Sequence, residues 1–435
     1  MLNKAFNLRA RNTSVKTEIV AGATTFLTMA YIIFVNPAIL SQTGMDKSAL
    51  IVITCLTTAI STLITGLYAN APIAMAPGMG LNAFFAYTLV ITDKIPWQTA
   101  LGMVFLSGFL CLLLTLLGFR KRLVEAIPQS LISAISVGIG LFITFIGLQN
   151  IGIVIDHPVT LVQAGNLNPT ILIGLVGLAV MIFLEAKEIK GSLLIGIIAA
   201  TIVAMLAGKV KTPDTFISTA INITPVAFRL DIISALKLSL FGIIFTLMFM
   251  DMFDSLGTLV ACCHEAKMVD ENGQIRKLGR LLAIDAVASM LGAVLGTSTT
   301  TSYIESASGI EEGGRTGLTA VVTGILFIVA IVFVPVVGVV PSYATAPALI
   351  MVGLFMMKEV KRIEFDKLET AFPAFIITIM IALSYSISTG LAFGFISFAM
   401  LKIIAGKARD IRPTMWLITV LSVFYFVIPL ISKHS

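Results

Sequence analysis

The sequence predicts an all-α membrane protein that crosses the bilayer many times. Three observations support this fold class: the composition, the recurrence of long apolar runs, and the few carboxylates that lie inside those runs. Hydrophobic residues make up 57% of the chain and charged residues only 12%, whereas a soluble protein carries about 25% charged residues. The mean hydropathy is +1.02. Most of this surface is therefore expected to face lipid.

Apolar runs of roughly membrane-spanning length recur almost from end to end. We place fourteen of them at residues 15–40, 47–69, 74–91, 97–118, 124–148, 168–186, 191–208, 234–260, 279–295, 302–312, 316–337, 343–357, 369–387 and 389–405. The runs at 74–91 and 302–312 contain breaks and do not resemble ordinary spanning helices. A further run at 414–431 exceeds the count of fourteen, and it either spans the membrane or lies along it. The polar, basic start of the chain argues against a cleavable signal peptide.

The loops predict the orientation of the chain. Cations cluster in the loops that lie on the same side of the membrane as the N-terminus. The loops on the opposite side carry few cations near the membrane. Because cytoplasmic loops are rich in Lys and Arg, the N-terminus is expected to be cytoplasmic, in a multi-pass protein of the inner (plasma) membrane. The cations that carry this prediction are Arg120, Lys121, Arg122, Lys187, Lys190, Lys267, Arg276, Lys277, Arg280, Lys358, Lys361, Arg362, Arg409 and Arg412. The net charge of +6 thus reflects topology, and no nucleic-acid partner is expected.

A weak internal repeat divides the chain into two halves. Leu193, Gly196 and Ala207-Gly208-Lys209 recur 198 positions later as Leu391, Gly394 and Ala405-Gly406-Lys407. Each half contains seven segments, and the third segment of each half is broken. Because seven is odd, the halves must enter the membrane from opposite sides, which makes the repeat inverted. Paired broken segments of this kind point to a transporter binding site near the midplane.

Two carboxylates lie in the apolar run of the eighth segment. Asp251 and Asp254 are three residues apart, so they share one face of a helix, which Ser255 and Thr258 extend. A charge at the centre of a membrane helix costs roughly 2.5–3.5 kcal/mol on insertion scales, and such residues usually mark a substrate or ion path. The alternative is that the helix end reaches cytoplasmic water. Asp285, by contrast, is interpreted as an interface residue near a cytoplasmic helix end.

The two breaks have complementary chemistry. Thr297 to Ser302 is an unbroken run of hydroxyl residues before Glu305, and such residues favour extended backbone over helix. In the first half, Pro77 and the glycines around it break the segment, and Asn82 follows with one acceptor and two donors. A half-helix that begins at such a break would direct its N–H groups at a ligand. The alternative for Glu305 is a short polar loop at the surface.

Four motifs together resemble the AzgA-type purine permeases, which belong to the nucleobase–ascorbate transporter superfamily. The motifs are Ala76-Pro-Gly-Met-Gly-Leu-Asn82-Ala-Phe-Phe85, Phe253-Asp254-Ser-Leu-Gly-Thr258-Leu, Thr299-Thr-Thr-Ser-Tyr-Ile-Glu305-Ser-Ala-Ser308 and Gly313-Gly-Arg-Thr-Gly-Leu318. The resemblance covers essentially the whole chain. It implies fourteen segments as two inverted seven-segment repeats, with short antiparallel strands in segments 3 and 10.

The resemblance also implies a division into core and gate. The core would comprise residues 15–119 and 234–337, the gate 120–210 and 341–407, and 408–435 would be a C-terminal hydrophobic extension. In that superfamily one carboxylate on segment 8 and one on segment 10 hold the base, and by motif position these are Asp254 and Glu305. Asp251 and Asn82 match positions linked to activity or recognition. We expect the polar side chains of Thr258 and Ser302 to complete the substrate site.

The resemblance implies uptake of a purine nucleobase by elevator-like alternating access, and the residues of the site agree with proton symport. A carboxylate accepts N–H donors of a base, or donates when protonated. Two acids facing each other in a water-poor site favour binding a proton, so Asp254 and Glu305 are also the expected proton-coupling groups; sodium coupling stays open. A 6-oxopurine, hypoxanthine or guanine, is favoured because its N1–H can reach a carboxylate, and Asp251 adds acceptor character. Adenine is the alternative.

Other classes fit less well. A same-fold carrier of uracil, xanthine, sulfate or bicarbonate is the nearest rival, although two facing acids disfavour an anion. An enzyme or a channel is not expected, because no HExxH or GxSxG motif occurs and most segments lack repeated polar positions. Neither a cofactor nor a metal is expected, since adjacent Cys262 and Cys263 lack metal-ligand spacing. The expected partners are the purine, a proton and the lipid bilayer. A homodimer is an open alternative to a monomer.

Overall fold

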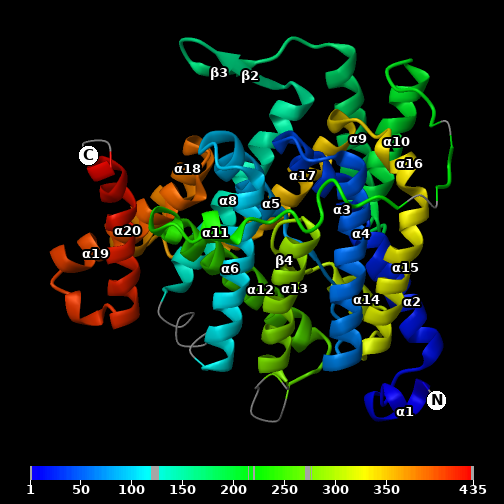
Figure 1. Cartoon of the computed structure of the whole chain (residues 1–435), viewed down its shortest axis with the longest axis horizontal. Coiled ribbons are helices and arrows are strands. Elements are labelled where there is room, and N and C mark those ends of the chain that lie inside the picture. The colour runs from blue at the N-terminus through cyan, green and yellow to red at the C-terminus, as the bar shows by residue number, and fades with distance from the viewer. Residues whose placement is uncertain are drawn as a thin grey trace.

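The computed structural model describes residues 2–118, 127–213, 215–218, 221–269, 275 and 277–432. Helices dominate this part of the chain (Figure 1). Ten of the described helices are long and apolar enough to cross a membrane. The protein is therefore a multi-pass membrane protein, as the composition predicts. The predicted loop cations Arg120, Lys121, Arg122 and Arg276 lie outside the described residues.

The elements of the first half follow the predicted segments closely. After α1 (Leu2–Ala5) and η1 (Arg9–Arg11), they are α2 (Val15–Met29) with α3 (Ile32–Leu40) and η2 (Ser41–Thr43), α4 (Lys47–Ile64) with η3 (Thr65–Ala69), β1 (Met75–Pro77) with α5 (Met79–Ala83) and η4 (Phe84–Thr92), α6 (Trp97–Leu116), α8 (Gln129–Ile151), α9 (Pro169–Ala186) and α10 (Ser192–Leu206). The hairpin of β2 (Val154–His157) and β3 (Leu161–Ala164), between α8 and α9, was not predicted.

The second half repeats this order. Its elements are α11 (Ile232–Ala235), η5 (Leu238–Leu240), α12 (Phe241–Glu265), α13 (Leu278–Leu295), β4 (Thr300–Ser302) with α14 (Ser306–Glu311), α15 (Gly317–Ala330) with η6 (Ile331–Phe333) and α16 (Val334–Gly338), α17 (Ser342–Met357) with η7 (Lys358–Arg362), α18 (Leu368–Ser384), α19 (Ile387–Ile404), η8 (Ala408–Asp410) and α20 (Pro413–Ser432). The extra apolar run forms α20, which packs against α19.

The inverted repeat is visible in the ends of α10 and α19, the seventh segment of each half. Both helices are followed by an alanine cap and then a glycine in the left-handed region, Gly208 at φ 67° and Gly406 at φ 70°. Gly196 and Gly394 also play the same role. A Cβ atom would lie 2.2 Å from Met181 at Gly196 and 2.0 Å from Ile377 at Gly394. Each glycine thus lets the seventh helix approach the sixth closely.

The two breaks form the predicted antiparallel pair of strands. Strand β1 pairs with β4 in the register Met75↔Ser302, Ala76↔Thr301 and Pro77↔Thr300. The Gly78 N–H continues the ladder by donating to the Thr299 carbonyl at 2.9 Å. Non-helical backbone inside a membrane must have its polar groups satisfied by protein, and each strand supplies partners for the other. Pro77 therefore lies in a strand before the half-helix α5 and does not end a helix.

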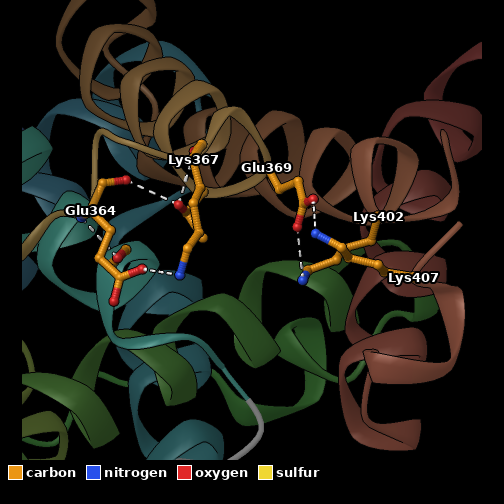
Figure 2. Close-up of polar contacts among 7 residues, drawn as sticks. Glu364, Lys367, Glu369, Lys402 and Lys407 are labelled. Atoms are coloured by element: carbon orange, nitrogen blue, oxygen red, sulfur yellow. Dashed lines mark hydrogen bonds and ion pairs between the residues drawn. The ribbon is translucent and has the colours of Figure 1, made fainter. Parts of the chain in front are cut away.

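The helices pack in two groups. Segments built from α2–α6 and α12–α15 contact one another, and segments built from α8–α10 and α17–α19 contact one another. The division into core and gate, with its boundaries, stays a prediction. Within the second group, α18 and α19 are joined by Glu369, which contacts Lys402 at 3.1 Å and Lys407 at 2.5 Å (Figure 2).

The start of α15 packs against η3 at a point where only glycines fit. A Cβ atom at Gly317 would be 1.8 Å from the Gly66 carbonyl oxygen. Nearby, the fully buried Glu18 carboxylate accepts hydrogen bonds from the backbone N–H groups of Arg315 at 2.9 Å and Thr319 at 3.1 Å. An acid at a helix N-terminus satisfies N–H groups that have no partner within the helix. The motif from Gly313 to Leu318 is therefore a helix-packing and capping motif.

Candidate functional site

A central pocket lies where the two broken segments cross. It holds about 620 Å³ of empty space, part of it at the open mouth. Both helix groups contribute to its wall. The lining residues are Tyr31, Gly78, Met79, Gly80, Leu81, Ile139, Met250, Asp254, Thr258, Thr301, Ser302, Tyr303, Ile304, Glu305, Val352 and Met356.

Asp254 and Glu305 both line this pocket. Asp254 lies in the middle of α12, and its side chain is exposed to the pocket. Glu305 directly precedes α14 and is half-buried. Thr301 lines the pocket together with Asp254. The alternative for Asp254, a helix end in cytoplasmic water, and the alternative for Glu305, a surface loop, are both wrong. Both acids line a pocket inside the helical bundle. Their predicted role as ligands stays a prediction.

Two tyrosines, neither of them predicted, organise the Glu305 side of the pocket. The Tyr31 hydroxyl donates to Glu305 Oε1 at 2.6 Å, and the Tyr303 hydroxyl donates to the Pro77 carbonyl oxygen at 2.6 Å. The first bond fixes the carboxylate, and the second joins the two crossing segments. Sequence offers little signal for Tyr31, because one tyrosine in an apolar run is usually packing material.

Asp251 does not line the pocket and is fully buried behind it. The Ser289 hydroxyl lies 3.2 Å from Asp251 Oδ2 and 3.0 Å from the Thr300 carbonyl oxygen, so it links α12 to β4.

Asp285 is also fully buried and accepts a short hydrogen bond from Ser255. The interpretation of Asp285 as an interface residue is therefore wrong: the helix places it inside the protein.

Asn82 likewise lies behind the pocket. It is fully buried, and its Oδ1 accepts a short hydrogen bond from the Ser298 hydroxyl, which ties α5 to the stretch before β4. Its Nδ2 has no hydrogen-bond partner among the described residues. The amide therefore supports the crossing of the two breaks, and its predicted contact with substrate would require a change in this arrangement.

Thr258 and Ser302 also line the pocket, and their predicted contact with substrate stays a prediction. Thr258 lies one helical turn after Asp254, and the Ser302 hydroxyl donates to the Ser255 carbonyl oxygen at 3.4 Å. Residues 79–81 begin α5, and the first turn of a helix has N–H groups without partners inside the helix. The pocket thus combines two acids with hydroxyls, amide donors and the apolar side chains of Ile139, Val352 and Met356.

Replacing Tyr31 by Phe is expected to weaken substrate binding about tenfold, because a hydrogen bond to a charged group contributes roughly 1.5–3 kcal/mol. The KM for the transported substrate should rise, with protein levels in the membrane unchanged. Tyr343→Phe is a suitable control, since Tyr343 lies on α17 and does not line the pocket. A wild-type KM in Tyr31→Phe would show that the bond to Glu305 does not affect the site.

Solved structures define the class of fold. The transmembrane domain of a cyanobacterium bicarbonate transporter, BicA, superposes with a TM-score of 0.65 at 16% identity, covering 85% of this chain and 95% of that one. The murine Solute Carrier 26 family member A9 anion transporter, in the inward-facing state, gives a TM-score of 0.65 at 10% identity, covering 90% and 69%. The chain thus has the inverted-repeat fold of a membrane transporter, as predicted.

Sequence comparisons define the family. The family model Xan_ur_permease, described as Permease family, matches residues 16–393, and the chain belongs to this family. A putative permease of Methanocaldococcus jannaschii is 46% identical over 98% of this chain and 97% of its own length. The adenine permease AdeP of Escherichia coli is 41% identical over 100% and 97%. The guanine/hypoxanthine permease PbuG of Bacillus subtilis is 41% identical over 97% and 98%. The resemblance to purine permeases is confirmed.

Proposed function

We propose that this protein takes up a purine nucleobase by proton symport. The observation that carries the proposal is the pair of acids, Asp254 and Glu305, in one pocket at the crossing of the two broken segments. Relatives that match almost the whole chain are named adenine and guanine/hypoxanthine permeases. A flat base fits a pocket that offers polar groups from one helix group and apolar side chains from the other.

The polar groups match the edges of a purine. A carboxylate accepts N–H donors of the base, and backbone N–H groups at the start of α5 can donate to a carbonyl or ring nitrogen. The apolar side chains Ile139, Val352 and Met356 belong to the second helix group, the proposed gate. Movement of the proposed core past the gate would then carry the base across the membrane, with the N-terminus on the cytoplasmic side of the plasma membrane.

Uptake is expected to depend on a proton gradient and not on sodium. Two acids in a pocket surrounded by protein favour sharing a proton, so binding the base and binding the proton would be coupled. The measurement is uptake of radiolabelled hypoxanthine by purine-transport-deficient cells, with and without a protonophore and with sodium replaced by potassium. Uptake that resists the protonophore and requires sodium would contradict proton symport.

Hypoxanthine and guanine are expected to compete for uptake better than adenine. A 6-oxopurine presents N1–H beside O6, which suits a carboxylate acceptor and a backbone donor. Adenine reverses this edge, and each unpaired buried group costs about 1–3 kcal/mol. Asp251 lies behind the pocket, so this preference rests on Asp254 and Glu305. Competition by adenine at lower concentration than hypoxanthine or guanine would favour an adenine permease, and competition by uracil or xanthine a carrier of another base.

A further inference from the structure

A second, basic pocket lies at the end of the molecule that carries the N-terminus. It contains about 980 Å³ of empty space, part of it open to solvent, and is lined by Ala10, Arg11, Asn12, Ala266, Lys267 and Arg315. These residues come from three parts of the chain: the N-terminal segment around η1, the end of α12, and the link between α14 and α15. Within the described part of the chain, no carboxylate lines the pocket.

The walls of this pocket are held in place by packing and hydrogen bonds. Leu8 and Phe6 are buried against Leu318, which fixes the N-terminal segment to α15. The Arg11 guanidinium contacts the Lys267 carbonyl oxygen at 3.5 Å. The Thr13 hydroxyl donates to the carbonyl oxygen of Gly313 at 3.3 Å. The cations are therefore brought together by the fold, and their proximity is not an accident of flexible side chains.

Arg315 is positioned by its own backbone contacts. Its Nη1 atom donates to the Gly314 carbonyl oxygen at 2.8 Å and also to that of Ile310. Both bonds are made by Nη1. A guanidinium has five N–H donors in a planar fork, so donors on the other two nitrogens do not take part in these bonds. The remaining donors lie on a group that lines the basic pocket. A fixed arginine of this kind suits bidentate recognition of a phosphate or carboxylate.

Two further cations lie near this end of the molecule, outside the lining of the pocket. Lys277 and Arg280 lie at the start of α13, and burial, followed by the charges of Arg280 and Arg11, lowers the pKa of Lys277. Among the described residues, the nearby acids do not line the pocket. Glu18 is fully buried and accepts hydrogen bonds from the start of α15, and the exposed Glu265 and Glu312 do not line the pocket.

We infer that the basic pocket binds a phosphate group through Arg11, Lys267 and Arg315, supplied by an anionic phospholipid headgroup or by free phosphate. The predicted orientation places the pocket at the cytoplasmic leaflet. That leaflet carries anionic lipids, and basic pockets at this level bind their headgroups. A ligand there would connect the N-terminal segment to the ends of α12 and α14. The site is separate from the central pocket and does not depend on which base is transported.

The test measures phosphatidylglycerol bound to the delipidated full-length protein by native mass spectrometry, with phosphatidylcholine for comparison. Arg11→Gln combined with Lys267→Asn is expected to weaken phosphatidylglycerol binding about 25-fold, because each surface cation contributes about 1 kcal/mol. Asn is chosen because Lys267 has a φ of 54°, which Asn tolerates. Lys187→Gln with Lys361→Gln is the matched control: both are exposed and outside the pocket.

A second arm measures binding of inorganic phosphate by calorimetry and its ability to displace phosphatidylglycerol. Phosphate binding that requires Arg11 and Lys267 supports the site with free phosphate as its ligand. Selective phosphatidylglycerol binding that phosphate does not displace supports the site with a lipid headgroup as its ligand. Equal binding of both probes by wild type and the pocket variant overturns the inference. An equal loss in the control variant also overturns it, because general surface charge would then explain the binding. Unchanged thermal unfolding temperatures verify that each variant is folded.

Discussion

Uptake is expected to fall at least about 100-fold when Asp254 is replaced by Asn or Glu305 by Gln, because each change removes a charged acceptor and leaves polar groups of the base unpaired. Both acids line the central pocket, on α12 and at the start of α14. Both replacements keep the size of the side chain, so the fold should persist. Radiolabelled purine uptake, normalised to protein in the membrane, measures the effect.

Glu312→Gln is the matched control for this prediction. Glu312 follows α14, the same short helix that Glu305 begins, but it is exposed and does not line the pocket. Its replacement should leave uptake unchanged. Wild-type uptake by either pocket variant at normal membrane levels would show that the acid concerned is not a ligand. If this variant were Glu305→Gln, Tyr31 would have no carboxylate ligand to position for transport.

Gly317→Ala is expected to destabilise the protein by about 3 kcal/mol or more, because overpacking at a backbone contact forces the helices apart. The added Cβ atom would lie 1.8 Å from the Gly66 carbonyl oxygen, which belongs to another segment and cannot rotate away. The packing of α15 against η3 would be lost at this point. The amount of monodisperse protein in detergent and its thermal unfolding temperature should both fall.

Gly338→Ala is the control for this effect. Gly338 ends α16 in the same segment, and a Cβ atom there meets nothing within 4 Å. Its unfolding temperature should stay at the wild-type value. If Gly317→Ala unfolds at the same temperature as Gly338→Ala, the contact between Gly317 and Gly66 is looser than the structure places it.

Local patterns in the sequence were sufficient for the segments and for the pair of broken helices. Lipid requires long apolar runs, and hydroxyl or Pro-Gly breaks exclude ordinary helix, so 74–91 and 302–312 were recognisable without any contact information. Asp254 and Glu305 were selected as candidates because a charged group inside or between apolar runs is costly, and their role as ligands stays a prediction. The hairpin β2–β3 was not predicted, because it lies outside the apolar runs.

Only the tertiary structure decided which polar residues face the pocket. Asp251 and Asp254 share a helix, yet one is buried behind the strands and the other is exposed to the pocket. Tyr31 reaches Glu305 across 274 positions of sequence, and Asp285 is enclosed by α12 and its neighbours. The sequence by itself determined where the chain crosses lipid, because burial in a membrane leaves a local signature. Which side chains meet depends on how distant helices pack, and no local pattern records that packing.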